Sequence, residues 1–192
     1  MVTAEQKEKI LRAMEPYMVM DEYGMSTVRN IYFDTDDFVL ARHSIAKPKY
    51  KEKLRIRSYS KAGEDSTVFV ELKRKYDHVV YKRRVGLPEK EAMEWIARGT
   101  RNAEETQRDM EIDYFLGYYK GLKPALYLSY DREAYRMRSG MSKLDGGSDF
   151  RVTFDSNIRC RETDVSLKSD PYGRSLLEDG MFLMELKCSG GI

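Results

Sequence analysis

Charged and apolar residues alternate with a period of two between Lys53 and Arg84. Successive residues of a strand point to opposite faces of a sheet, so the runs KLRIRSY, VFVELKRK and VYKRRV predict three strands, each with an apolar and a charged face. This alternation is typical of an antiparallel sheet with one solvated face. Lysine and arginine dominate the charged faces, which is unusual. The residues on these faces include Lys53, Arg55, Arg57, Glu71, Lys73, Lys82 and Arg84.

Helical patterns flank these strands. Capping-box patterns and prolines that suit a first helical turn predict four helices. The predicted helices cover residues 3–20, a segment that opens at Pro88, about 103–119 (with Asn102 and Glu105 as its capping box), and a short segment from Asp170 to Gly180. In the third helix, the predicted apolar positions are Met110, Tyr114, Phe115 and Tyr118. Residues 38–50 show no clear pattern.

Four further segments alternate with a period of two and predict strands. They are residues 28–34, 124–137, 149–158 and 181–188. Three of them add cations to the same kind of face, namely Arg132, Arg151 and Lys187, together with the carboxylates Asp155 and Glu185. The glycine-containing segment 139–148 predicts a flexible hairpin loop. The sequence therefore predicts an α+β fold with seven strands.

Composition restricts the class of protein. A chain of 192 residues favours one domain with a sizeable core. The 34 Lys and Arg residues nearly balance the 32 Asp and Glu residues, which argues against a general nucleic-acid-binding protein. Any strong positive field must therefore be local. Cys160 and Cys188 lie far apart in the sequence, which favours a reduced, cytoplasmic setting. No apolar run is long enough to span a membrane, and no signal-peptide pattern opens the chain.

The repeated cationic faces leave two interpretations open. A single strand of this kind is usually a solvated outer face. Six strands that repeat the pattern favour a face that gathers cations, although two like charges 4 Å apart repel by roughly 4 kcal/mol at an effective dielectric constant near 20. A bound polyanion would remove that cost, since arginine and lysine suit phosphate oxygens. Glu71, Glu185 and Asp155 are either ligands of a divalent metal ion or structural counter-charges.

Six runs occur together and in order: KLRIRSY, VFVELKRK, VYKRRV, YDREAY, RVTFDS and MELK. In this order they resemble the VTC domain, the catalytic domain of the vacuolar transporter chaperone polyphosphate polymerase and its bacterial relatives. That family belongs to the triphosphate tunnel metalloenzymes, with the CYTH-type proteins. The resemblance implies an eight-stranded antiparallel β-barrel that forms a tunnel with flanking helices. About seven strands are expected here, in a single domain over residues 1–192 without the family's first strand and C-terminal segment.

The resemblance also implies roles for particular residues. Arg55 and Arg57 resemble the paired arginines that hold nucleotide phosphates, and Glu185 resembles the metal-binding glutamate, with Glu71 as a second candidate ligand. The expected catalytic residues, which also bind substrate, are Arg55, Arg57, Lys73, Lys82, Arg84, Arg132, Arg151 and Lys187; Lys53 is expected to bind substrate alone. The expected cofactor is Mn²⁺ or Mg²⁺.

The implied reaction is transfer of the terminal phosphoryl group of ATP to a polyphosphate chain. Two alternatives stay open: hydrolysis of triphosphate or a nucleoside triphosphate, and a non-catalytic module that binds polyphosphate. The expected ligands are ATP, triphosphate or polyphosphate, with no nucleic acid. The eukaryotic members of the family imply a membrane-associated partner, and no feature of the sequence indicates an oligomeric state.

Overall fold

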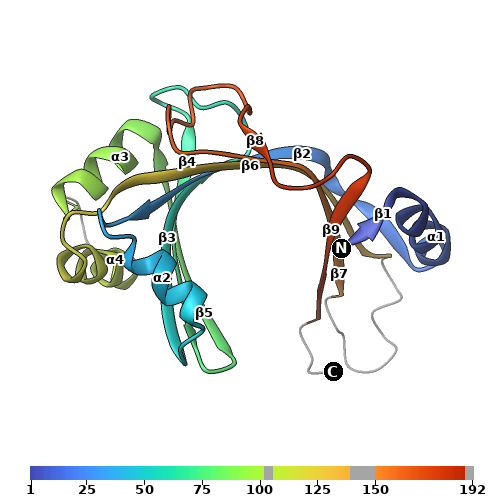
Figure 1. The fold of residues 1–192 in the computed structure, drawn as a ribbon, viewed down its shortest axis with the longest axis horizontal. Helices are drawn as coiled ribbons and strands as arrows, with labels where there is room; N and C mark the ends of the chain where they lie inside the picture. The colour runs from blue at the N-terminus through green and yellow to red at the C-terminus, as the bar shows by residue number, and fades with distance from the viewer. Residues whose placement is uncertain (102–105, 139–149, 189–192) are drawn as a thin grey trace. The chain divides into compact units, whose positions relative to one another are not determined.

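The computed structural model describes residues 1–101, 106–138 and 150–188 (Figure 1). Within these residues, nine strands form one sheet in the order β1-β9-β7-β6-β2-β3-β4-β5, with β8 paired to β7. The strands are β1 (Val2–Thr3), β2 (Met18–Asp34), β3 (Tyr50–Ser58), β4 (Thr67–Tyr76), β5 (Val79–Pro88), β6 (Lys123–Met137), β7 (Arg151–Arg161), β8 (Arg174–Ser175) and β9 (Met181–Lys187). The seven predicted strands are confirmed, and β1 and β8 are additional two-residue strands. The described pairings form a linear series, so the sheet is not closed into the predicted barrel.

In the part of the chain that the structure describes, four helices accompany the sheet: α1 (Ala4–Met14), α2 (Val39–Ala46), α3 (Glu89–Arg98) and α4 (Gln107–Tyr118). The backbone contacts divide the chain into two compact units, which are described separately. The first unit holds residues 1–28, 129–159 and 173–192, and the second holds residues 29–128 and 160–172. In the described residues, no helix is long and apolar enough to cross a membrane.

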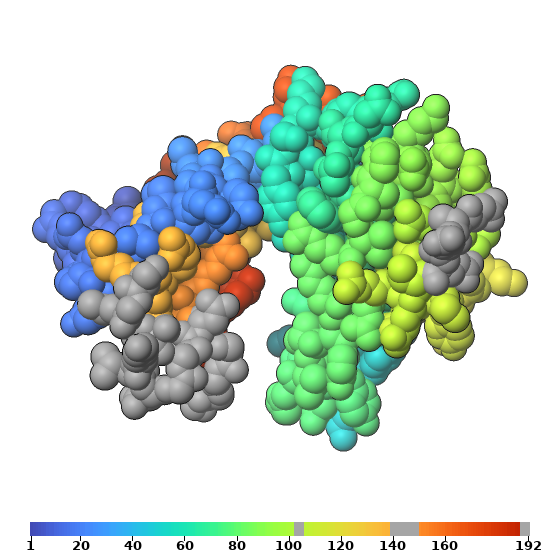
Figure 2. All heavy atoms as spheres, turned by 180° about the vertical axis from the view of Figure 1, so that it is seen from behind, coloured from blue at the N-terminus to red at the C-terminus, as the bar shows by residue number. Residues whose placement is uncertain are grey.

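The second unit contains the larger core. The apolar faces of β3 and β4 pack against α3 and α4, which lie together on one side of these strands (Figure 1). The core includes Leu54, Ile56, Val70, Leu72, Trp95, Ile112, Phe115 and Leu116. Figure 2 shows that the hairpin of β4 and β5 extends beyond the two helices. Because the helices cover the apolar face, the charged face of β3, β4 and β5 is left for other contacts.

The first unit has a smaller core around Met18, Val152 and Phe154. Apolar residues of α1, Ile10 and Leu11 among them, pack against this core. Thr3 and Gln6 form a capping box at the start of α1, since Thr3 Oγ1 accepts a hydrogen bond from Gln6 N and Gln6 Oε1 accepts one from Thr3 N. Residues of the helix itself therefore determine where α1 begins.

Three helix predictions need correction. The first helix ends at Met14 instead of residue 20, because Met18 opens β2 and places its side chain in the core. The segment from Asp170 to Gly180 is not helical. The guanidinium of Arg161 accounts for this, since it donates hydrogen bonds to the carbonyls of Asp170 and Tyr172 and holds the chain as a loop.

The third helix is shorter than predicted and buries a different face. Residues 102–105, with the predicted cap at Asn102, lie outside the described residues, as does the predicted loop at 139–148. The helix α4 is capped by Thr106 and Asp109. Its buried stripe is Ile112, Phe115 and Leu116, whereas Met110, Tyr114 and Tyr118 are exposed, so only Phe115 of the predicted apolar positions is confirmed as buried.

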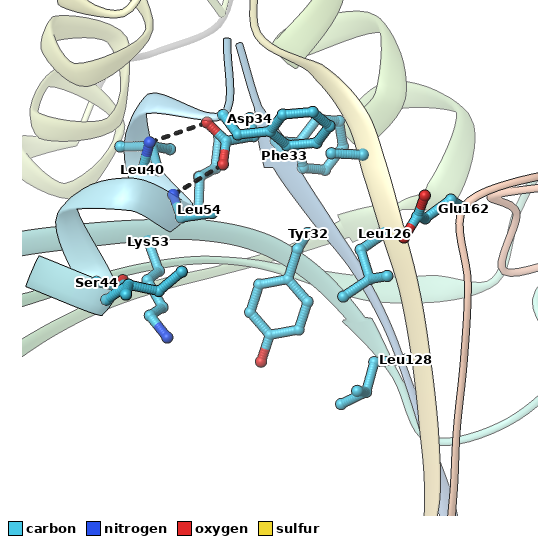
Figure 3. Close-up of a pocket in the computed structure, with 14 residues that line it drawn as sticks. Tyr32, Phe33, Asp34, Leu40, Ser44, Lys53, Leu54, Leu126, Leu128 and Glu162 are labelled. Carbon is cyan, nitrogen blue, oxygen red and sulfur yellow. Dashed lines mark hydrogen bonds between the residues drawn. The ribbon is translucent and has the colours of Figure 1, made fainter. Parts of the chain in front are cut away.

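The segment without a clear pattern forms α2. The side chain of Asp34, at the end of β2, accepts hydrogen bonds from the backbone nitrogens of Leu40 and Ala41, each at 2.9 Å. A carboxylate in this position satisfies free N–H groups of the first helical turn. Asp34 therefore fixes where α2, which packs against β3, begins (Figure 3).

Candidate functional site

A buried carboxylate lies at the centre of the charged face in the second unit. The strand register places Glu71 of β4 directly between Arg55 of β3 and Arg84 of β5. The side chain of Glu71 is 1% exposed. A buried carboxylate is stable only when cations or hydrogen-bond donors surround it.

Four cations surround Glu71. Arg55 Nη2 lies 2.7 Å from Oε2, and Lys82 Nζ lies 2.7 Å from Oε1. Arg84 Nε is 3.6 Å from Oε1, and Arg57 Nε is 3.9 Å from Oε2. One negative charge is thus shared among four positive charges. We call these five residues the Glu71 cluster.

The pKa values agree with an excess of positive charge. Burial opposes ionisation of Glu71, but Arg55, Lys82 and Arg57 outweigh it and lower the pKa to about 2. Burial likewise raises the pKa of Tyr59, yet the neighbouring Arg57 and Arg84 lower it below its ordinary value. Both pKa shifts indicate that the positive electrostatic potential extends beyond Glu71 to Tyr59.

Lysines continue the charged face on one side of the cluster. Lys53, Lys73 and Lys82 are direct cross-strand neighbours on β3, β4 and β5. Lys53 and Lys73 line a cavity of about 440 Å³ whose charged lining also includes Lys51, Arg55, Lys75 and Glu71. Five cations against one carboxylate make this cavity, which we call the basic cavity, a place for an anion.

A second set of predicted residues lies in the first unit. Arg132 forms a two-pronged ion pair with Asp155, with both contacts at 2.7 Å. Glu185 Oε2 lies 3.9 Å from Arg132 Nη2 and 3.7 Å from Lys187 Nζ. Arg151 is a cross-strand neighbour of Lys187 but pairs with Asp21 at 2.7 Å. We call Arg132, Asp155, Glu185 and Lys187 the Arg132 set.

The structure therefore brings the predicted residues together in two groups. Arg55, Arg57, Lys82 and Arg84 meet at Glu71, with Lys53 and Lys73 in the adjacent row. Arg132, Lys187 and Glu185 meet within the other unit, and Arg151 lies beside them at Lys187.

The sequence profile of the VTC domain matches residues 1–192. The chain belongs to the VTC domain family. No curated protein matches the sequence. Among solved structures, the VTC domain is similar to a protein from Bacillus halodurans that is provisionally described as an adenylate cyclase, with 18% sequence identity and a TM-score of 0.53 over 98% of this chain and 76% of that chain. A protein from Hippeastrum, provisionally described as an adenylyl cyclase with dominant triphosphatase activity, has 13% identity and a TM-score of 0.43 over 78% of this chain and 66% of that chain.

The likeness to the Bacillus halodurans protein bears on the fold of this VTC domain alone. The likeness to the Bacillus halodurans protein shows that the two share an α+β architecture based on an antiparallel sheet. At 18% sequence identity, this likeness gives no information about which reaction the chain catalyses.

The two predicted metal ligands differ in how well they fit a cation. Both oxygens of Glu71 already contact cations at 2.7 Å, so a metal ion there would face four like charges. Glu185 is 48% exposed, and its ion pairs are longer than 3.5 Å. Hard divalent cations prefer oxygen ligands, so Glu185 fits a metal ion that also binds phosphate oxygens and water. No group of three metal-ligating side chains occurs among the described residues.

Two polar residues of β2 complete the Glu71 cluster and were absent from the predicted site. Asn30 is fully buried and accepts a hydrogen bond from Arg57 Nε at 3.0 Å. Tyr32 Oη accepts one from Arg55 Nη1 at 2.9 Å. Both residues lie two positions apart within the strand predicted at 28–34, so the period of two places them on one face. This signal was available in the sequence.

Acid should weaken the Glu71 cluster in a defined pH range. A lowered pKa means that Glu71 stabilises the folded chain fully above its ordinary pKa of 4.5, and this contribution is lost as the pH falls towards about 2. We expect thermal unfolding to show a constant difference between the unmodified chain and Glu71→Gln from neutral pH down to about 4.5, and a shrinking difference below it. A difference that stays constant down to the acid limit would contradict this assignment.

Proposed function

We propose that this VTC domain binds a phosphate chain in the basic cavity and on the Glu71 cluster, and that it transfers the terminal phosphoryl group of ATP to polyphosphate. The observation that carries the proposal is the charge imbalance around Glu71, where four cations share one carboxylate. A structural ion pair needs one partner for each charge. The remaining positive charge is therefore available to phosphate oxygens.

The row of lysines supports the same ligand. Like charges in direct cross-strand positions destabilise a sheet, and Lys53, Lys73 and Lys82 occupy such positions. A multivalent anion removes this repulsion because each phosphate group can lie between two ammonium groups. Triphosphate and polyphosphate carry such charges at regular spacing along a linear chain.

The residues of the cluster are suited to positioning the phosphate groups. Glu71 and Tyr32 hold the guanidinium of Arg55 from two sides, so it is oriented before substrate binds. Phosphoryl transfer depends mainly on positioning and on neutralising charge, and it requires no nucleophilic side chain. The acceptor oxygen comes from the polyphosphate chain itself, or from water in the hydrolytic alternative.

The proposed metal ligand is Glu185. A divalent ion held there would neutralise charge on a phosphate group bound within the first unit. Arg132, fixed by its two contacts with Asp155, supplies a guanidinium next to Glu185 that can bind a phosphate oxygen. Glu71 is proposed to act as a structural counter-charge.

The products of ATP incubation test the proposal. With ATP and Mn²⁺ or Mg²⁺, we expect a polymer that a polyphosphate-binding dye stains. Release of orthophosphate without polymer would instead identify a hydrolase that uses the same residues. Salt-sensitive binding of polyphosphate without turnover would identify a binding module, as expected for a site dominated by charge.

Substitution of the proposed metal ligand separates catalysis from binding. We expect Glu185→Gln to lower turnover by about 100-fold or more, since the carboxylate would supply a metal ligand. Binding of tripolyphosphate should change by less than about threefold, because the basic cavity is intact. Glu178→Gln, an exposed carboxylate in the same unit, serves as the control. Turnover that survives Glu185→Gln would show that Glu185 is not the metal ligand.

A further inference from the structure

An aromatic residue continues the charged face of the second unit beyond the Glu71 cluster. The strand register places Phe69 of β4 between Arg57 of β3 and Gly86 of β5. Phe69 precedes Glu71 by two positions on the same strand, so the two side chains lie on the same face of the sheet. Phe69 does not belong to the apolar core of this unit. Its ring therefore has another role than core packing.

The ring of Phe69 is stacked on Arg84. The guanidinium carbon of Arg84 lies 3.6 Å from the centre of the Phe69 ring. Tyr59, which follows β3, meets the Phe69 ring edge to face with the ring centres 5.8 Å apart. The Tyr59 hydroxyl also accepts a hydrogen bond from Arg84 Nη2 at 3.4 Å. Since the face of an aromatic ring attracts a cation, two aromatic residues hold this one guanidinium.

Arg84 is held differently from the closest cations of the Glu71 cluster. Arg55 and Lys82 each lie 2.7 Å from an oxygen of Glu71, whereas Arg84 Nε lies 3.6 Å from Oε1. This Nε is buried and has no hydrogen-bond partner among the described residues. The whole side chain of Arg84 is 35% exposed, so a ligand can reach it. The position of Arg84 thus depends on stacking more than on a short ion pair.

Gly86 makes room for the Phe69 ring. A Cβ atom at position 86 would lie 3.2 Å from Cε1 and 3.4 Å from Cδ1 of Phe69, which is tighter than ordinary van der Waals contact. A glycine inside a strand often marks such a close approach. The ring can therefore lie against the backbone of β5, where it reaches Arg84 two residues before Gly86.

We infer that Phe69 is a positioning residue that orients Arg84 toward the bound phosphate chain. This inference rests on the proposed function and adds a residue to its site. Arginine has many rotamers, and fixing one of them before the ligand binds lowers the entropic cost of binding. Stacking on a ring occupies none of the N–H donors of the guanidinium. These donors are therefore available to phosphate oxygens.

A double-mutant cycle tests the inference. Dissociation constants for tripolyphosphate are measured by calorimetry on the full chain, at a temperature at which every variant is folded. We expect Phe69→Leu to weaken binding by about fivefold and Arg84→Gln by about tenfold or more. In the Arg84→Gln background, Phe69→Leu should weaken binding further by less than about twofold. A residue that acts through Arg84 has no effect once Arg84 is removed.

Three further variants separate positioning from a general structural effect. Phe69→Tyr keeps the ring and should bind tripolyphosphate within about twofold of the unmodified chain. Gly86→Val places a branched side chain where the ring lies, so it should weaken binding about as much as Phe69→Leu does. Tyr81→Leu is the matched control, because it removes an exposed ring from the opposite face of β5. It should leave the affinity unchanged.

The phenol of Tyr59 reports the position of Arg84 without any ligand. Burial raises the pKa of this phenol, and the guanidinium groups of Arg57 and Arg84 lower it below its ordinary value. If Phe69→Leu releases Arg84, the pKa of Tyr59 should rise. An NMR titration of the chain with ¹³C-labelled tyrosine, with Tyr59→Phe to assign the signal, measures this change.

Three results would each overturn the role of Phe69. They are an unchanged affinity of Phe69→Leu for tripolyphosphate, an effect of Phe69→Leu that is undiminished in Arg84→Gln, and a Tyr59 pKa that does not rise. Each of these results leaves the proposed phosphate site intact. Failure of the unmodified chain to bind tripolyphosphate at all would overturn the proposed function as well.

Discussion

Glu71→Gln is expected to lower the free energy of unfolding by about 3–5 kcal/mol, the range typical of removing one partner from a buried ion pair. The substitution preserves shape but removes the one negative charge that four cations share. Arg55 and Lys82 would lose contacts of 2.7 Å and repel each other across β4. Chemical denaturation at neutral pH measures the loss.

Added tripolyphosphate should restore much of this stability. An anion that binds the folded chain only stabilises it by mass action, and it would supply the charge that Glu71→Gln removes. We therefore expect a larger rise in unfolding temperature on adding tripolyphosphate for the variant than for the unmodified chain. Glu94→Gln breaks an exposed pair with Arg98 and should cost less than about 0.5 kcal/mol. Equal effects of the two substitutions would show that Glu71 does not organise the cations.

Replacement of two lysines in the basic cavity should have the largest effect on ligand binding. We expect Lys53→Gln combined with Lys73→Gln to weaken tripolyphosphate binding by about 100-fold or more, since a hydrogen bond to a charged group contributes roughly 1.5–3 kcal/mol. The two residues are cross-strand neighbours, so their removal also relieves repulsion. The unfolding temperature should therefore not fall.

The matched control changes net charge equally at another place. Lys90 and Lys120 are exposed, belong to the same unit and do not line the basic cavity. Lys90→Gln combined with Lys120→Gln should weaken binding by less than about threefold, which is the effect of net charge alone. Similar losses in the two double variants would mean that binding follows net charge and not the cavity.

The local pattern of the strands could be predicted because it depends on neighbouring residues only. Alternation with a period of two placed Lys53, Arg55 and Arg57 on one face, and the structure has them there. Which residue of one strand lies opposite which residue of the next depends on register. Register follows from packing and turn geometry and cannot be determined from alternation alone.

The interpretation of Glu71 shows this limit. Its sequence neighbours indicated a carboxylate among cations, which left both a metal ligand and a counter-charge open. Only the register reveals that Arg55 and Arg84 lie directly beside it on the adjacent strands. The resulting short contacts favour the counter-charge.

Tertiary contacts explain the incorrect helix predictions. Asp170 and Pro171 form a helix-start pattern, yet Arg161 binds the carbonyls of that segment, and Lys61 binds the side chain of Asp170. The helix α2 was missed because its start depends on Asp34, which belongs to the preceding strand. Local propensity is a weak guide where such contacts compete with it.

The most direct test of the account is a crystal structure of this VTC domain with tripolyphosphate. The account predicts that the phosphate chain lies in the basic cavity, with phosphate oxygens about 3 Å from the ammonium groups of Lys53 and Lys73 and from the guanidinium of Arg55. Tripolyphosphate bound at another surface, while the basic cavity holds only water, would contradict it.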